Sequence, residues 1–241
     1  MTPRLVAGVD SSTQSCKVVI FDPATDQIVR TGRASHPSGT EVDPEAWWSA
    51  LLEAIRDAGG LEDVGAISIA GQQHGMVLLD QAGNAVRPAL LWNDVRSSGE
   101  AQQLIDHFGA QWLASNTGSV PVPSFTATKL LWVKNNEPEN LIRVAAVCLP
   151  HDYLSWRLSE SYPDINGLFT DRSDASGTGY FSPATNEYLD EVLDYCLGKS
   201  VVVPRIVDHG EVGGKVRADL ASHRIAIGAG MGDNAGAAQG I

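Results

Sequence analysis

Two acidic residues near opposite ends of the chain, Asp10 and Asp233, lie beside predicted turns whose backbone a charged ligand could approach. Asp10 is the first of them. It ends an apolar, strand-like run and precedes the polar residues 11–15, Ser-Ser-Thr-Gln-Ser. Hydroxyl residues in a tight turn offer N–H and O–H donors at one point, as a phosphate needs. A carboxylate beside such a turn can hold Mg²⁺ while the ion bridges phosphate oxygens. The sequence lacks the P-loop pattern GxxxxGK[ST], and a Ser/Thr-rich hairpin turn is the structural alternative.

Asp233, the second carboxylate, follows glycines at positions 228, 230 and 232 and precedes Asn234 and a run of small residues. The pattern predicts a short buried strand over 224–229, a glycine-rich turn, and a helix that begins near Asp233. Glycine has no side chain and tolerates positive φ, so a ligand can come close to the backbone of such a turn. The structural alternative is that Asp233 only caps the helix, since Asp is a favoured N-cap residue.

Two polar clusters between these ends suit a polyhydroxylated ligand. Gln72, Gln73 and His74 lie between glycines where an apolar strand is predicted to end, and amides and imidazoles both donate to and accept from hydroxyls. Further on, Trp92 precedes Asn, Asp and Arg, so its ring could stack on a sugar while the polar groups bind hydroxyls. The alternatives are a structural histidine at 74, and Trp92 in the core with Asp94 capping the next helix.

The composition excludes several classes of protein. Of the 241 residues, 17 are Lys or Arg and 29 are Asp or Glu, for a net charge of −12. This charge argues against general binding of nucleic acid or anionic membranes. Cys16, Cys148 and Cys196 form no CxxC pair, which favours reduced thiols. We see no signal peptide and no apolar run of the ~20 residues that span a bilayer, so the cytoplasm is the expected location.

The first seventy residues predict a mixed sheet. Apolar runs at Leu5 to Val9, Lys17 to Phe21 and Ile28 to Ala34 are joined by turns too short for a crossover helix, so these strands should be antiparallel. Asp43 and Pro44 should open a helix that runs to about Ala58. A buried strand over Val64 to Ala70 then brings the Gln-Gln-His cluster to its end.

The later elements are predicted from the same signals, namely hydrophobic periodicity and the Gly, Pro and polar residues that end a helix or strand. We expect a hairpin of 76–79 with 86–91, helices over 96–108, 126–135, 150–158 and 186–196, strands over 144–149 and 212–216, and a loop over 164–180.

Taken together and in order, the motifs resemble those of the FGGY carbohydrate kinases. These are DSST after the first strand, GQQHG, LLWNDVR, SFTATKLLW, LPHDYL and GDNA. GQQHG, WNDVR and GDNA resemble most the xylulokinase branch of that family. The resemblance covers the whole chain, and it implies two lobes of α/β, ribonuclease H/actin-like fold, each a mixed sheet flanked by helices, with an early antiparallel hairpin. The first lobe of the family holds the sugar and the second holds the adenine.

The resemblance also implies a role for each matching residue. Asp233 corresponds to the general base that takes the proton from the attacking sugar hydroxyl, and Asp10 to the carboxylate associated with Mg²⁺. ATP is the implied phosphate donor. The implied phosphate turn comprises Ser12, Thr13 and Gln14, and the implied sugar pocket comprises Gln73, His74, Trp92, Asp233 and Asn234.

Family members continue into a second lobe of similar size, so residues 1–241 correspond to the N-terminal sugar-binding lobe alone. The expected reaction is ATP-dependent phosphorylation of a ketopentose, D-xylulose to D-xylulose 5-phosphate, with little or no turnover by this chain without the C-terminal lobe. The alternatives are a sugar-binding or regulatory module without phosphoryl transfer, and a kinase for glycerol, gluconate or ribulose. Oligomeric state is left open, with a homodimer as one alternative.

Overall fold

The largest sheet of the molecule is mixed, and its strand order is β13-β14-β5-β1-β2-β3 with β15 paired to β5. The structure is a computed structural model that describes residues 5–239, so the extreme ends of the predicted lobe lie outside the described residues. The strands are β1 (Leu5–Ser11), β2 (Ser15–Asp22), β3 (Gln27–Ser35), β5 (Val64–Gly71), β13 (Val212–Lys215), β14 (Ala226–Gly228) and β15 (Met231–Gly232).

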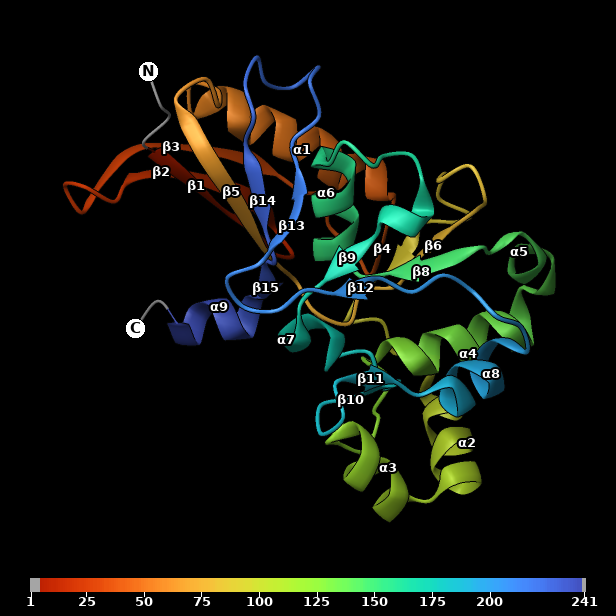
Figure 1. Cartoon of the computed structure of the whole chain (residues 1–241). Helices are drawn as coiled ribbons and strands as arrows, with labels where there is room; N and C mark the ends of the chain where they lie inside the picture. Colours follow the sequence, from red (N-terminus) through yellow and green to blue (C-terminus); the bar gives the residue numbers. More distant parts are fainter. Residues whose placement is uncertain (1–4, 240–241) are drawn as a thin grey trace.

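The predicted antiparallel beginning of the sheet is confirmed. Strands β1 and β2 pair antiparallel, as do β2 and β3. By contrast, β5 is parallel both to β1 and to β15. Because the carboxyl ends of parallel strands meet at one edge, the residues that follow β1, β5 and β15 are gathered there (Figure 1).

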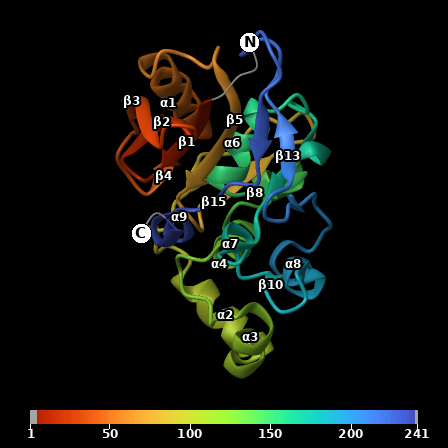
Figure 2. The same cartoon turned by 60° about the vertical axis from the view of Figure 1, so that its left-hand side comes forward.

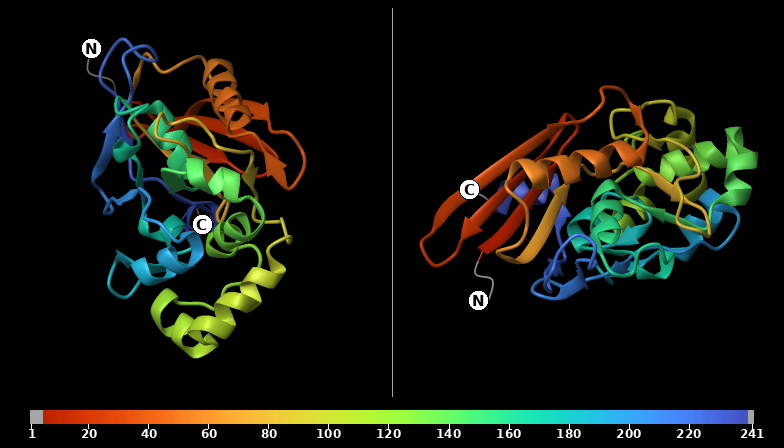
Figure 3. Two further views of the ribbon diagram at one scale, coloured as in Figure 1. Left: turned by 90° about the vertical axis from the view of Figure 1, so that its right-hand side faces the viewer. Right: turned by 90° about the horizontal axis from the view of Figure 1, so that it is seen from above.

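One face of the sheet is covered by α1 (Pro44–Asp57) and α6 (Pro150–Leu158), which pack on β2, β3 and β5 and on each other (Figure 3). Helix α1 begins as predicted, because the Asp43 carboxylate accepts a hydrogen bond from Glu45 N at 3.0 Å and Pro44 takes the first helical position. It lies very close to β3, since a Cβ added to Gly32 would come within 2.1 Å of Ala54 O.

A second, mostly helical part lies beyond the carboxyl edge of the sheet (Figures 1 and 2). Its helices are α2 (Ser98–Phe108), α3 (Ala110–Thr117), α4 (Thr126–Asn136), α5 (Pro138–Arg143) and α8 (Asp190–Leu197). They share a core of their own that includes Leu104, Leu130 and Val192. The described residues also form four short strand pairs: β4 (Glu41–Val42) with β7 (Ala89–Leu90), β6 (Val77–Leu79) with β8 (Ala146–Cys148), β9 (Phe169–Thr170) with β12 (Arg205–Ile206), and β10 (Phe181–Ser182) with β11 (Glu187–Tyr188).

Three predictions of local structure were wrong in part. The segments 76–79 and 86–91 make a turn and isolated bridges, but their strands pair mainly with β8 and β4. The predicted loop over 164–180 contains a 3₁₀ turn (Ile165–Gly167), β9 and helix α7 (Arg172–Ala175). Helix α8 begins four residues later than predicted position 186, at Asp190, because residues 187–188 form β11. In each case partners distant in sequence determine the structure.

No helix within residues 5–239 is both long and apolar enough to cross a membrane. All three cysteines are buried free thiols, in agreement with the prediction.

The contact between α1 and β3 can be tested by adding one methyl group. Gly32→Ala would force the Ala54 carbonyl and the Ala58 amide apart, and overpacking of this kind costs about 1–3 kcal/mol. Chemical denaturation should therefore show a lower free energy of unfolding. Gly99→Ala in α2 is the matched control, because a Cβ there meets no atom within 4 Å. A Gly32→Ala variant as stable as wild type would contradict this packing.

Candidate functional site

A hollow of about 500 Å³ lies at the carboxyl edge of the sheet and is lined by Asp10, Asp233 and Asn234, with Ala70, Gly236 and Ala237. Asp10 comes from the end of β1. Asp233 is the first residue of α9 (Asp233–Gln239), which directly follows β15. The structure thus brings together two acidic residues that the sequence separates by almost its full length.

Asp233 is half-buried, and burial raises the pKa of its carboxyl group above the usual value for Asp. The backbone N–H of Asn234 donates to Asp233 Oδ1 at 2.8 Å and lowers the pKa, while the negative charge of Asp10 raises it further. A carboxylate with a raised pKa is a stronger proton acceptor. The environment of Asp233 therefore makes its carboxylate more basic than that of an ordinary exposed Asp.

Asp10 is partly exposed, and its Oδ2 lies 3.2 Å from Lys17 Nζ. Within the described residues, Oδ1 makes no hydrogen bond. A carboxylate oxygen facing a hollow of this kind has the chemistry that Mg²⁺ requires, since that ion binds through one or two carboxylates while it keeps several waters.

The turn after Asp10 is held from two sides. The ring Nδ1 of His36 lies 2.9 Å from Ser12 O, and His36 N donates to Gln14 O at 2.9 Å. Thr13 Oγ1 accepts from Trp92 Nε1 at 2.9 Å. The predicted phosphate turn and the predicted sugar-stacking residue therefore lie side by side.

The side-chain amide of Gln73 links α9 to α7 through two hydrogen bonds. Its Oε1 accepts from Asn234 Nδ2 at 2.9 Å, and its Nε2 donates to Ser173 O at 2.9 Å. Ser173 belongs to α7, and its Oγ accepts from Gly232 N at 3.0 Å. Residues from three distant segments thus fix one amide pair at the rim of the hollow.

His74 has a positive φ of 66°, and its ring packs on Phe125 with centroids 4.8 Å apart. Its Nδ1 lies 2.6 Å from Gly177 O, which makes Nδ1 the donor. Burial lowers the pKa of His74, so the ring is neutral at pH 7. Tertiary packing fixes the orientation of this side chain.

Trp92 is 46% exposed, which rules out the alternative of a core residue. The residues that line the hollow, however, include neither Trp92 nor the polar residues that follow it. Asp94 is buried and accepts from Arg96 N and Thr40 Oγ1, and Arg96 also pairs with Glu41. The part of the WNDVR motif that could meet a ligand is Trp92, whereas Asp94 and Arg96 hold the loop.

Lys129 is a site-supporting residue that sequence reasoning missed. It is fully buried in α4, and its Nζ donates to Ser124 O and, at 3.4 Å, to His74 O. Burial lowers the pKa of the Lys129 amine to about 7. A neutral amine has two N–H groups, which match these two carbonyls. Lysine is usually exposed, so its contact with the backbone of His74 could not be read from the sequence.

The family whose sequence profile matches residues 5–240 is described as "FGGY family of carbohydrate kinases, N-terminal domain". The chain is 46% identical over 249 aligned residues to a xylulose kinase of Streptomyces rubiginosus, with 98% of this chain and 50% of that protein covered. It is 34% identical to the xylulose kinase of Escherichia coli strain K12, with coverage of 97% and 49%. The chain spans about half the length of these curated relatives.

Solved structures give the same result. The crystal structure of a xylulose kinase from Bifidobacterium adolescentis matches with a TM-score of 0.94 and 42% identity, covering 100% of this chain and 55% of that chain. A gluconate kinase from Lactobacillus acidophilus matches with a TM-score of 0.84 and 24% identity over 95% of this chain and 48% of that chain, which shows the fold alone. The predicted ribonuclease H/actin-like α/β fold is confirmed.

The buried amine of Lys129 predicts a pH-dependent stability. Its folded pKa of about 7 lies below the ordinary 10.5, so between these values the unfolded chain binds more protons than the folded one. Stability should therefore rise with pH from neutrality upward, by at most about 1.4 kcal/mol per pH unit. Lys129→Met should remove this slope in denaturant titrations at pH 7, 8 and 9.

Lys134→Met on the same helix is the matched control and should retain the slope, because Lys134 is only partly buried. Equal slopes in wild type and Lys129→Met would contradict a neutral Lys129.

Proposed function

Because this chain belongs to the FGGY family of carbohydrate kinases, we propose that residues 1–241 are the N-terminal, sugar-binding lobe of an ATP-dependent kinase. The reaction we propose is the conversion of D-xylulose to D-xylulose 5-phosphate. The observation that carries the proposal is the single hollow lined by both Asp10 and Asp233, with Asn234 beside them. A ligand in that hollow would contact both Asp233, the proposed base, and Asp10, the proposed Mg²⁺ ligand.

Asp233 is the proposed catalytic base. It would accept the proton of the sugar hydroxyl as that oxygen attacks the γ-phosphorus of ATP, with ADP as the leaving group. Burial and the nearby charge of Asp10 raise the pKa of Asp233, which supports this role. Phosphoryl transfer depends mainly on positioning and charge neutralisation, so one base in a well-defined hollow is a sufficient contribution from this lobe.

Asp10 is the proposed residue for Mg²⁺, and the turn of Ser12, Thr13 and Gln14 is the proposed contact for ATP phosphates. A bound Mg²⁺ would neutralise charge on the phosphate oxygens. The hydrogen bonds of His36 to the backbone of this turn support the proposal, because a preformed turn loses less conformational entropy when it binds an anion.

For the sugar, we propose contacts with Gln73, His74, Trp92 and Asn234 in addition to Asp233. D-Xylulose is favoured because relatives at 46% and 34% identity over nearly the whole chain are xylulose kinases. The fold by itself does not select the substrate, since a gluconate kinase shares it. The amide pair Gln73–Asn234 supports recognition of neighbouring hydroxyl groups.

The C-terminal half of the relatives is the proposed partner of this lobe and the proposed source of the adenine site. On this basis we infer little or no turnover by the 241-residue chain alone. The alternative is a sugar-binding module without phosphoryl transfer. The pairing of Asp10 with Asp233 in one hollow favours the kinase, because binding alone requires neither residue. A cytoplasmic location and a homodimer remain predictions.

Sugar binding can be tested on this chain directly. Titration calorimetry with D-xylulose should show saturable binding that is stronger than binding of glycerol, gluconate or ribulose. Trp92→Ala should weaken binding about tenfold, the loss expected when one stacking contact of about 1–1.5 kcal/mol is removed. If none of the four compounds bound, the proposed sugar pocket would be wrong.

The role of Asp233 is tested in the intact protein that contains this chain. Asp233→Asn should lower kcat by about 100- to 10,000-fold, the usual contribution of a general base, and should leave the dissociation constant for the sugar within about tenfold. Glu53→Gln on the exposed side of α1 is the control and should behave as wild type. Turnover at the wild-type rate in Asp233→Asn would remove this residue from its role.

A further inference from the structure

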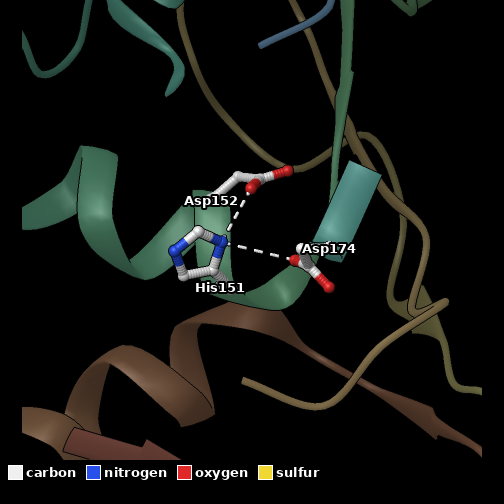
Figure 4. Close-up of side chains that lie close together, drawn as sticks. All are labelled: His151, Asp152 and Asp174. Carbon is white, nitrogen blue, oxygen red and sulfur yellow. Dashed lines mark hydrogen bonds and ion pairs between the residues drawn. The ribbon is translucent and has the colours of Figure 1, made fainter. Parts of the chain in front are cut away.

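Behind the turn that carries Asp233 lies a completely buried group of His151, Asp152 and Asp174 (Figure 4). His151 and Asp152 are in the first turn of α6, and Asp174 is in α7. His151 Nδ1 lies 2.9 Å from Asp152 Oδ1 and 3.3 Å from Asp174 Oδ2. The sequence showed LPHDYL as a motif but gave no role to its histidine.

The other ring nitrogen of His151, Nε2, lies 3.0 Å from Ala229 O. A backbone carbonyl can only accept, so Nε2 must carry a hydrogen. Nδ1 faces carboxylate oxygens, and imidazole is a stronger base than a carboxylate. The proton between them therefore belongs to the ring, and both ring nitrogens are protonated.

The charges around the ring agree with this assignment. Asp152 accepts a second hydrogen bond, since Leu149 N donates to its Oδ2 at 2.8 Å. Asp174 Oδ2 lies 3.3 Å from the same Nδ1 and has no other hydrogen-bond partner within the described residues, so the positive ring is its available counter-charge. Burial raises the pKa of Asp174 to about 7, and the hydrogen bond and charge of His151 oppose this rise. Burial opposes a charged His151, but the hydrogen bonds and charges of the two carboxylates outweigh it and raise the pKa of His151.

Further ionisable groups lie close to this cluster. Burial and the charges of Asp152 and Asp174 raise the pKa of Tyr180 and of Tyr188, so both hydroxyl groups are uncharged. Cys148 in β8 is a buried thiol whose pKa is raised by burial, so it is uncharged. Asp171 precedes α7, and its carboxylate accepts from Ser173 N and Asp174 N. Within the described residues, none of these groups donates a hydrogen bond to Asp152 or Asp174.

The contact of His151 with Ala229 matters for the hollow because the next few residues of the chain lead directly to Asp233. Gly230 has a φ of 76°, and a Cβ there would lie 1.9 Å from His151 Nε2. Two residues later, Gly232 N donates to Ser173 Oγ of α7. The turn between β14 and β15 is thus held at both ends, by α6 and by α7, immediately before Asp233.

We propose that His151 is a permanent imidazolium that positions Asp233 and Asn234 by holding the Ala229 carbonyl. The consequence for catalysis rests on the function proposed above, whereas the protonation and the anchoring of the turn do not. The same three residues have ligand atoms within 4.8 Å of one another, as in a metal site. A metal would need Nδ1 as a lone-pair donor without its hydrogen, so the protonation state of Nδ1 separates the two assignments.

The first test is nitrogen NMR of the 241-residue chain labelled at histidine. The spectrum should contain one ring with both nitrogens protonated from pH 6 to pH 9, and this signal should be absent from His151→Gln. A deprotonated ring nitrogen on His151 at pH 7 would overturn the proposal. This measurement requires neither sugar nor ATP, so its result does not depend on the proposed function.

The second test compares His151→Gln with His223→Gln. His223 makes the same type of bond, 2.7 Å from Val64 O, at the opposite end of β5. In His151→Gln, amide exchange at residues 230–234 should be about tenfold faster, and kcat of the intact protein should fall about tenfold or more. His223→Gln should change neither. Equal exchange in the two variants would overturn the anchoring role.

If His151→Gln does not fold, Asp174→Asn is the alternative test variant, because it keeps the volume of the side chain. With one carboxylate removed, His151 should lose its Nδ1 hydrogen at a lower pH than in wild type. An unchanged titration would overturn the charge pairing. If the NMR and exchange results agree with the proposal and the intact protein shows no kinase activity, the proposed function fails and the role of His151 in holding the turn stands.

Discussion

The site depends on the position of one residue in the sheet, Gly71 at the end of β5. Gly71 is paired with Ser11 of β1 on one side and with Gly232 of β15 on the other. Both pairings are parallel, so the chain leaves all three strands at the same edge. Asp10 and Asp233 come to one hollow for this reason, although more than two hundred positions separate them. The other hydrogen bonds of the site mainly fix the positions of residues at this edge of the sheet.

The edge is stabilised by polar groups buried behind it. His151 binds the carbonyl of Ala229 before the last strand, and Lys129 binds the carbonyl of His74 after the middle one. The His151 ring and the Lys129 amine are both fully buried, and each contacts a backbone oxygen. A buried polar group is costly unless it is hydrogen-bonded, so such contacts have few alternative geometries. This explains how loops, which are normally mobile, can present a fixed set of side chains.

Helix α7 shows how the two parts of the molecule are joined at the site. It lies within a segment that reads as a loop, yet it contacts β15 and supplies Ser173 to both Gln73 and Gly232. The Asp171 side chain starts this short helix by accepting from the N–H groups of residues 173 and 174. Four residues cannot form a stable helix alone, so α7 exists because the surrounding structure holds it.

The sequence by itself determined the elements whose signals are local. The antiparallel strands β1 to β3, the capped helix α1 and the helix that starts at Pro150 all follow from periodicity and from residues such as Asp43, and the motifs identified the family. Only the tertiary structure decided the rest: the pairing of β6 with β8, helix α7, and the tasks of Lys129 and His151. Their partners lie some fifty to one hundred positions away in sequence. Hydrogen bonds at that separation depend on how strands and helices pack, which no local pattern encodes.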